Sequence, residues 1–118
     1  MFFILFVLHD TDALNDVLTA WEECGVSGVT ILPSTGLARF RHKGGLREDL
    51  PLIPSLDDLT ERMENTNRTL FTIVNDQAMV DRVLAATEAV TGNLDLPDTG
   101  ILVVLPVAQV KGLNRIQR

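Results

Sequence analysis

A strand–helix unit that occurs twice constrains the fold of this chain more than any other feature of its sequence. The apolar run Ile4–Leu8 leads through an acidic turn into the amphipathic segment Ala13–Ala20, and the same order returns 66 positions later in Leu70–Val74 and Met79–Ala86. Identical residues stand at equivalent places: Asp10 and Asp76, Val17 and Val83, Leu18 and Leu84, Ala20 and Ala86, Glu22 and Glu88. The sequence therefore predicts a duplicated unit.

The segments that follow the two helices correspond as well. Val29–Pro33 matches Leu102–Pro106 with a shift of 73. Four strands are predicted: Phe2–Leu8, about 28 to 32 with a continuation past Pro33 toward Gly36, Leu70–Val74, and Ile101–Leu105. The order β-α-β-β-α-β with right-handed crossovers gives an α+β, ferredoxin-like fold. We expect a four-stranded antiparallel sheet with both helices on one face, in a single domain spanning residues 1–118.

The hydrophobic periodicity places the two helices. The first begins at the capping residues Asp10 or Asp12 and ends at Gly25, and the second covers about 77 to 91 and closes at Gly92. Residues with helical spacing give each helix one apolar face. The expected buried positions are Leu14, Val17, Leu18 and Trp21 in the first helix, and Met79, Val80, Val83, Leu84 and Val90 in the second.

The strands are apolar on both faces, although the predicted helices cover only one. Phe2–Leu8 and Ile101–Leu105 have no polar residue, and 29 to 32 has a single threonine. Exposed apolar patches beyond a few hundred Å² mark interfaces in soluble proteins. We therefore expect the uncovered face to pack against another copy of the chain.

Composition narrows the classes of partner and the compartment. A net charge of −6 argues against a nucleic-acid or anionic-membrane binder. The single cysteine, Cys24, cannot form an internal disulfide, so a cytoplasmic location is expected. The N-terminal apolar run has no basic leader and is too short to cross a bilayer, which needs about 20 residues. It is interpreted as a buried strand.

Residues 37–68 form a long insertion without a strong strand pattern. A capping-box spacing at Ser55 predicts a short helix over about 56 to 64. The first 38 positions contain no Lys or Arg, whereas Arg39, Arg41, Lys43 and Arg47 fall within nine residues beside two glycines. Such a loop can bind phosphate or carboxylate. A solvated basic loop without a ligand is the alternative.

No pattern of catalytic residues stands out, so we expect a protein that is not an enzyme. No serine lies in a nucleophile-elbow motif, and neither His9 nor His42 has a spacing to acidic residues that suggests catalysis. His9 stands near Asp10 and Asp12, but these carboxylates have a helix-capping role, so no metal site is expected. The connection 91–100 can equally be a ligand-binding loop or a set of turns.

At several places the chain resembles the PII signal-transduction (nitrogen regulatory) proteins. Gly25–Ile31 followed by Gly36–Arg39 is similar to the family's G-V-x-G-x-T strand and G-x-G-R turn, which lead into its long T-loop. Asn75–Gln77, Thr91–Gly92 and Leu102–Val107 match as well. The resemblance covers nearly the whole chain apart from about 41 to 67.

This resemblance implies a homotrimer with the apolar sheets facing inward. The family binds adenine nucleotides (ATP, ADP or AMP) in clefts between subunits, and its T-loop docks onto transporters, enzymes or regulators. Carried over by position, the ligand-binding residues are Thr30, Gly36, Leu37, Ala38 and Arg39 from one subunit, with Gly92, Asp98, Thr99 and Gly100 from the loop after the second helix, and Lys111 as a substitute cation. Loop 37–68 would contact the partner protein, and nucleic acid and direct membrane insertion are not expected.

Several residues depart from the family pattern. Ala38 replaces the second glycine of the turn, Thr99 stands at a glycine, and Gly100 stands where the phosphate-binding lysine is found. Gly112 and Asn114 replace two arginines, and each lost charge-assisted contact is worth ~1.5–3 kcal/mol. The chain has no tyrosine to be uridylylated, and Phe40 replaces a magnesium-ligating glutamine.

Four other kinds of protein stay open as alternatives or are disfavoured. One is an interaction or structural trimer that has lost nucleotide binding. Another is a metal-handling trimer of the CutA type, which the shortage of His and Cys disfavours. An acylphosphatase-like enzyme lacks its phosphate loop after the first strand. An RNA-binding sheet would need exposed aromatic residues beside a basic surface, whereas the phenylalanines lie among aliphatic residues in an acidic chain.

Overall fold

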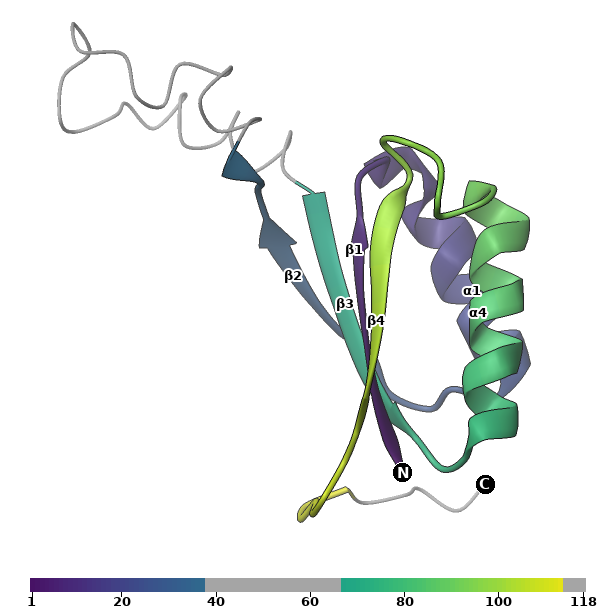
Figure 1. Cartoon of the computed structure of the whole chain (residues 1–118), viewed down its shortest axis with the longest axis vertical. Helices are drawn as coiled ribbons and strands as arrows, with labels where there is room; N and C mark the ends of the chain where they lie inside the picture. Colours follow the sequence, from purple (N-terminus) through teal and green to yellow (C-terminus); the bar gives the residue numbers. More distant parts are fainter. Residues whose placement is uncertain (38–66, 114–118) are drawn as a thin grey trace, which may run out of the picture.

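The computed structural model describes residues 1–37 and 67–113, which form a sheet with two helices on one face (Figure 1). The elements are β1 (Phe2–Leu8), the 3₁₀ turn η1 (Thr11–Ala13), α1 (Leu14–Cys24), β2 (Thr30–Ser34), β3 (Asn67–Val74), α4 (Gln77–Thr91) and β4 (Gly100–Pro106). The strand order is β2-β3-β1-β4, and every pair of neighbours is antiparallel. The predicted α+β fold with a four-stranded antiparallel sheet is confirmed, and it is compatible with a ferredoxin-like arrangement.

The ends of three strands differ from the prediction. β2 begins at Thr30, two residues later than expected, whereas β4 extends one residue further at each end. β3 begins at Asn67 because Asn67 and Arg68 pair with Ser34 and Pro33. The last two residues of the expected insertion 37–68 therefore belong to the sheet. The expected helix over 56 to 64 lies outside the described residues.

Both helices begin and end close to where the sequence predicts. Asp10 caps η1 by accepting a hydrogen bond from the Asp12 amide, and Gly25 ends α1 in the left-handed conformation at φ 102°. Asp76 accepts a bond from the Met79 amide at 2.9 Å and starts α4. The prediction that Leu84 is buried is wrong, because this side chain lies beside the buried face of α4 and is 37% exposed.

The core lies between the helices and the covered face of the sheet. Fully buried Trp21 of α1 lies over β1, with its ring centroid 6.4 Å from that of Phe6. The buried apolar side chains are Ile4, Phe6, Leu8, Val17, Trp21, Val26, Leu70, Val74, Val80 and Val83. Among the described residues, no helix is long and apolar enough to cross a membrane.

The sequence repeat appears in the structure as an approximate two-fold axis. We call residues 1–34 the first unit and residues 67–107 the second unit. In the β1–β3 ladder Leu5 pairs with Phe71, which stands 66 positions later, so the axis passes between these two residues. It also passes between the helices at Trp21 and Thr87, another pair 66 apart, where the Trp21 Nε1 donates to the Thr87 Oγ1 at 2.8 Å.

Candidate functional site

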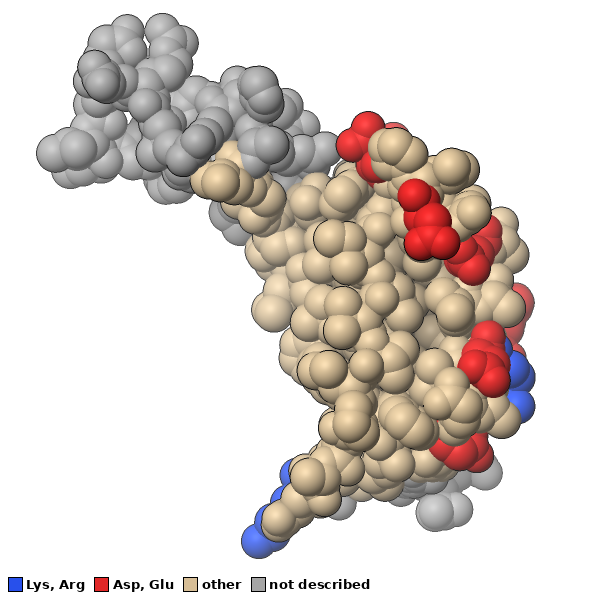
Figure 2. Space-filling model, in the orientation of Figure 1, with Lys and Arg blue, Asp and Glu red and all other residues tan. Residues whose placement is uncertain are grey.

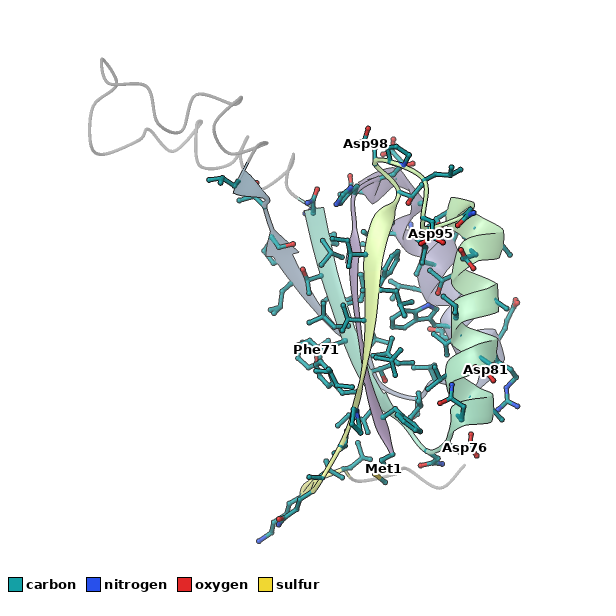
Figure 3. All side chains as sticks on the ribbon, in the orientation of Figure 1. Met1, Phe71, Asp76, Asp81, Asp95 and Asp98 are labelled. Atoms are coloured by element: carbon teal, nitrogen blue, oxygen red, sulfur yellow. The ribbon has the colours of Figure 1, made fainter. Side chains whose placement is uncertain are left out.

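The face of the sheet that the helices leave uncovered, here called the open face, is apolar over β1 and β4 and carries polar side chains toward the β2 edge. The register assigns neighbouring residues to it, since paired residues lie on the same face of a sheet. Its members are Phe3, Leu5 and Val7 of β1, Thr30, Leu32 and Ser34 of β2, Asn67, Thr69, Phe71 and Ile73 of β3, and Ile101, Val103 and Leu105 of β4. Figure 3 shows Phe71 on the side of the sheet away from the helices.

Packing on the open face extends across strands. The rings of Phe3 and Phe71 are 5.4 Å apart between centroids, and Ile101 and Leu105 are 58% and 51% exposed. Four strands about 4.8 Å apart, with about 3.3 Å per residue, give this face roughly 19 by 20 Å, or roughly 400 Å². A patch of that size lies within the range of the largest apolar patch on a typical monomer, which is often a functional surface.

Charged side chains lie away from the described part of the open face. None of the residues assigned to it is Asp, Glu, Lys or Arg. Acidic side chains instead follow the helices and the loop before β4, as the red atoms in Figure 2 show. Aromatic rings on central strands could stack with nucleic-acid bases, but the described part of this face supplies no cation to contact phosphate. An apolar partner fits it better.

The residues predicted from β2 lie at one edge of the sheet. Thr30 is exposed on the open face, where it pairs with Phe71. Gly36 and Leu37 follow the end of β2, and Leu37 is 65% exposed. Ala38 and Arg39, the other two residues predicted here, lie outside the described residues. Of the predicted residues that the structure describes at this edge, Thr30 therefore offers a hydroxyl, and Gly36 and Leu37 offer backbone groups.

The loop 92–99 after α4 is fixed by its own hydrogen bonds. The Glu88 carboxylate accepts from the Leu94 amide at 2.9 Å, and the Asn93 side chain accepts from the Asp95 amide at 2.9 Å. The Thr99 hydroxyl is positioned to donate to the Leu96 carbonyl oxygen at 2.9 Å. Its donor is thus directed into the loop, so Thr99 is poorly placed to donate to a ligand.

Gly100 has a packing role that the sequence did not suggest. A Cβ at this position would stand 2.6 Å from the Val7 carbonyl oxygen and 2.8 Å from the Phe6 ring, and its φ of 151° is one that side chains rarely adopt. No lysine could occupy this place without moving β1. The position equivalent to the PII-type lysine is therefore closed to any side chain in this structure.

Carboxylates, rather than cations, surround this loop in the described part of the chain. Asp95 and Asp98 are exposed at the top of the molecule in Figure 3, and Asp98 adopts a left-handed backbone conformation with φ 64°. Residues 92–100 contain no Lys or Arg. A phosphate that approached this loop would meet negative charge and would need cations from elsewhere.

The predicted binding residues that the structure describes lie in separate places. β2 and β4 are the two edge strands, so the ends of β2 and the loop before β4 are separated by β3 and β1. Three strand spacings correspond to about 14 Å. Lys111 follows β4 at the opposite end of the sheet from Gly100. A cleft that combined Thr30 and Gly36 with Gly92 and Asp98 of the same chain would have to span this distance, whereas a second copy could supply one of the two sets.

The described residues hold no group of three or more His, Cys, Asp or Glu side chains that could bind a metal ion. Cys24 is partly buried, and its Sγ donates to the Arg82 carbonyl oxygen at 3.6 Å. Sequence reasoning missed the contact between Trp21 and Thr87 and the Ser34–Thr69 bond of 2.7 Å. The repeat offset of 66 could have indicated the first, because residues on a two-fold axis meet their own equivalents.

Comparison with protein-family models and with curated proteins finds no match for this chain.

Proposed function

We propose that this chain is a non-catalytic PII-like regulatory protein that acts as a homotrimer and binds a small anionic ligand between subunits. The observation that carries the proposal is the arrangement of the sheet. The described part of its open face is largely apolar and has no charged side chain, and the residues proposed for the ligand site lie at opposite edges of it. Copies that pack through their open faces would bring an edge of one subunit toward an edge of the next.

The hydrophobic effect supplies the driving force for this assembly. Transfer of apolar surface out of water contributes about 25 cal/mol per Å². Roughly 400 Å² on each copy would provide at most about 10 kcal/mol, less for its polar part, before the entropy cost of association is subtracted. The acidic helices would remain in solvent on the outside, where the repulsion between like charges is screened by salt.

The proposed ligand is an adenine nucleotide, with ATP, ADP and AMP as candidates. Because the described part of the site lacks cations, the proposal assigns the contact with phosphate to Arg39, which lies outside the described residues. Backbone groups of the loop 92–99 and of Gly36 would contact the uncharged parts of the ligand. Loop 37–68 would dock onto a partner protein, such as a transporter, an enzyme or a regulator.

The acidic loop favours a second candidate function, an interaction trimer that has lost nucleotide binding. Asp95 and Asp98 repel phosphate, the Thr99 hydroxyl is directed into its own loop, and Gly100 admits no side chain. The two candidates share the assembly and differ in the ligand. Two separate measurements are therefore needed.

Assembly is tested by the mass of the particle in solution, measured by light scattering during size-exclusion chromatography. We expect three chains for the native protein and one chain for Val103→Lys, which places a charge on the open face. The control is Ala85→Lys on the exposed side of α4, which should leave the mass unchanged. A monomeric native protein would refute the assembly and the inter-subunit site together.

Ligand binding is tested by thermal unfolding with ATP, ADP, AMP, cyclic dinucleotides or bicarbonate, each with and without magnesium. A ligand at about 100 times its Kd stabilises the folded state by ~2.7 kcal/mol. A raised midpoint with an adenine nucleotide, lost in Arg39→Ala, would support the sensor. An unchanged midpoint with every ligand, in a protein that is still trimeric, would support the interaction trimer.

A further inference from the structure

The first and second units depend on each other for every strand pair of the sheet. In the order β2-β3-β1-β4, the two strands of the first unit are not neighbours, because β3 lies between them. In the same way β1 lies between β3 and β4 of the second unit. Each unit therefore has a gap between its own strands, and the first strand of the other unit fills that gap.

Side-chain hydrogen bonds between distant described residues follow the same rule. The Trp21 Nε1 donates to Thr87, and the Cys24 Sγ donates to the Arg82 carbonyl oxygen. On the sheet side Thr69 bonds with Ser34, and the Thr72 hydroxyl donates to the Gly28 carbonyl oxygen. Each of these four bonds joins the first unit to the second.

Packing of the two units is also complementary rather than merely repeated. Trp21 and Thr87 occupy equivalent positions on the two-fold axis, and both are fully buried. A large ring in one helix therefore fits beside a small hydroxyl in the other, whereas two tryptophans at these positions would collide. A first unit thus recognises a second unit better than it recognises another first unit.

We infer that the interface between the units is a binding surface for a second copy of this chain, so that two copies can exchange units. The first unit of one copy then pairs with the second unit of the other, with the same strand pairs and the same Trp21–Thr87 bond. Because the two units belong to one polypeptide, each is held at a high effective concentration near the other. This inference is independent of the ligand and of packing through the open face.

Complementation between two damaged full-length chains tests the exchange. The first variant carries Val83→Asp and Val80→Asp, which put charges into the core of its second unit; Val83 is 0% exposed and Val80 is 4% exposed. The other variant carries Val17→Asp in its first unit, together with Trp21→Phe. Val17 is also 0% exposed. Because the chain has one tryptophan, all tryptophan emission in a mixture comes from the first variant.

The two variants are unfolded in urea, mixed and refolded by dilution. If units exchange, Trp21 of the first variant becomes buried against Thr87 of the other chain, and its emission shifts to the shorter wavelength of the native protein. The shift should saturate as the tryptophan-free variant is added. Either variant refolded alone gives no such shift.

The matched control is a tryptophan-free chain with Val17→Asp, Val80→Asp and Val83→Asp, which has no intact unit to supply. A shift with the complementing variant and none with this control would support the inference. Emission that stays at the wavelength of the unfolded first variant, at every ratio of the two chains, would overturn it. Light scattering of the shifted sample should show a particle of at least two chains.

Discussion

The two units begin with equivalent strands and end in different structures. β1 and β3 pair around the two-fold axis, and Asp10 and Asp76 both cap the turn that follows. In the second unit the turn continues directly into α4, a helix of 15 residues, whereas in the first unit it forms η1 before the 11-residue α1. Residues 66 positions apart thus lie on either side of the axis, whereas the two helices differ in length.

The strands that follow the helices differ more. β4 has seven residues and pairs along all of β1, while β2 has five and leaves residues 25–29 outside the sheet. Within that segment the Gly28 carbonyl oxygen accepts a hydrogen bond from the Thr72 hydroxyl. The edge formed by β2 leads into the insertion, and the edge formed by β4 leads into the C-terminal segment. The duplicated core is therefore symmetric, and the two units differ mainly at the edge strands β2 and β4.

The largest break in the symmetry is Trp21 opposite Thr87, and truncation of the ring should cost the most. For Trp21→Ala we expect a loss of ~3–5 kcal/mol in the free energy of unfolding, because a fully buried ring leaves a cavity. Urea unfolding followed by circular dichroism measures it. A loss below about 1 kcal/mol, the size of an ordinary surface effect, would show that the helices do not rely on this contact.

A glycine stands at or just before the start of each edge strand, and alanine substitutions test whether the two positions are packed differently. Gly100→Ala should cost ~1–3 kcal/mol, since its Cβ would collide with the Val7 carbonyl oxygen and the backbone would be strained. Gly28→Ala in the first unit has no atom within 4 Å of the added carbon and should change stability by less than about 0.5 kcal/mol. Equal losses at the two glycines, measured by urea unfolding, would contradict the packing role of Gly100.

Thr87 tests whether the contact on the axis depends on its hydrogen bond or only on its shape. Thr87→Val keeps the volume but leaves the buried Trp21 Nε1 without an acceptor, so we expect a loss of ~1–3 kcal/mol. Thr87→Ser keeps the hydroxyl and should retain the bond. Thermal unfolding would give the midpoints. If the serine variant were the less stable of the two, packing rather than the bond would dominate.

The caps give the smallest expected effects. Asp76→Ala removes the acceptor for the Met79 amide and should cost ~0.5–2 kcal/mol. Asp10→Ala affects a 3₁₀ turn rather than the start of a long helix, so its loss should lie toward the lower end of the same range. Chemical unfolding of both variants compares them. A larger loss at Asp10 would indicate that η1 and α1 act as one helix.

Local sequence patterns determined the elements of this protein. An apolar run predicted the bounds of β1, and helical spacing with Gly92 at the end predicted those of α4. These signals are local, since a cap, a glycine and a periodicity act within a few residues. The repeat of 66 positions also predicted a duplicated unit, which the structure arranges around an approximate two-fold axis.

Tertiary structure alone decided how far the strands extend, which side chains are buried and how the candidate site is divided. β3 begins early because β2 supplies partners at Asn67 and Arg68, and Leu84 is exposed because α4 turns Val80 and Val83 toward the sheet. Gly36 and Gly100 are separated because of the strand order. No single segment of the sequence indicates that order. Register, burial and strand order arise from contacts between residues far apart in the chain, so a one-dimensional pattern could propose the site residues but could not bring them together.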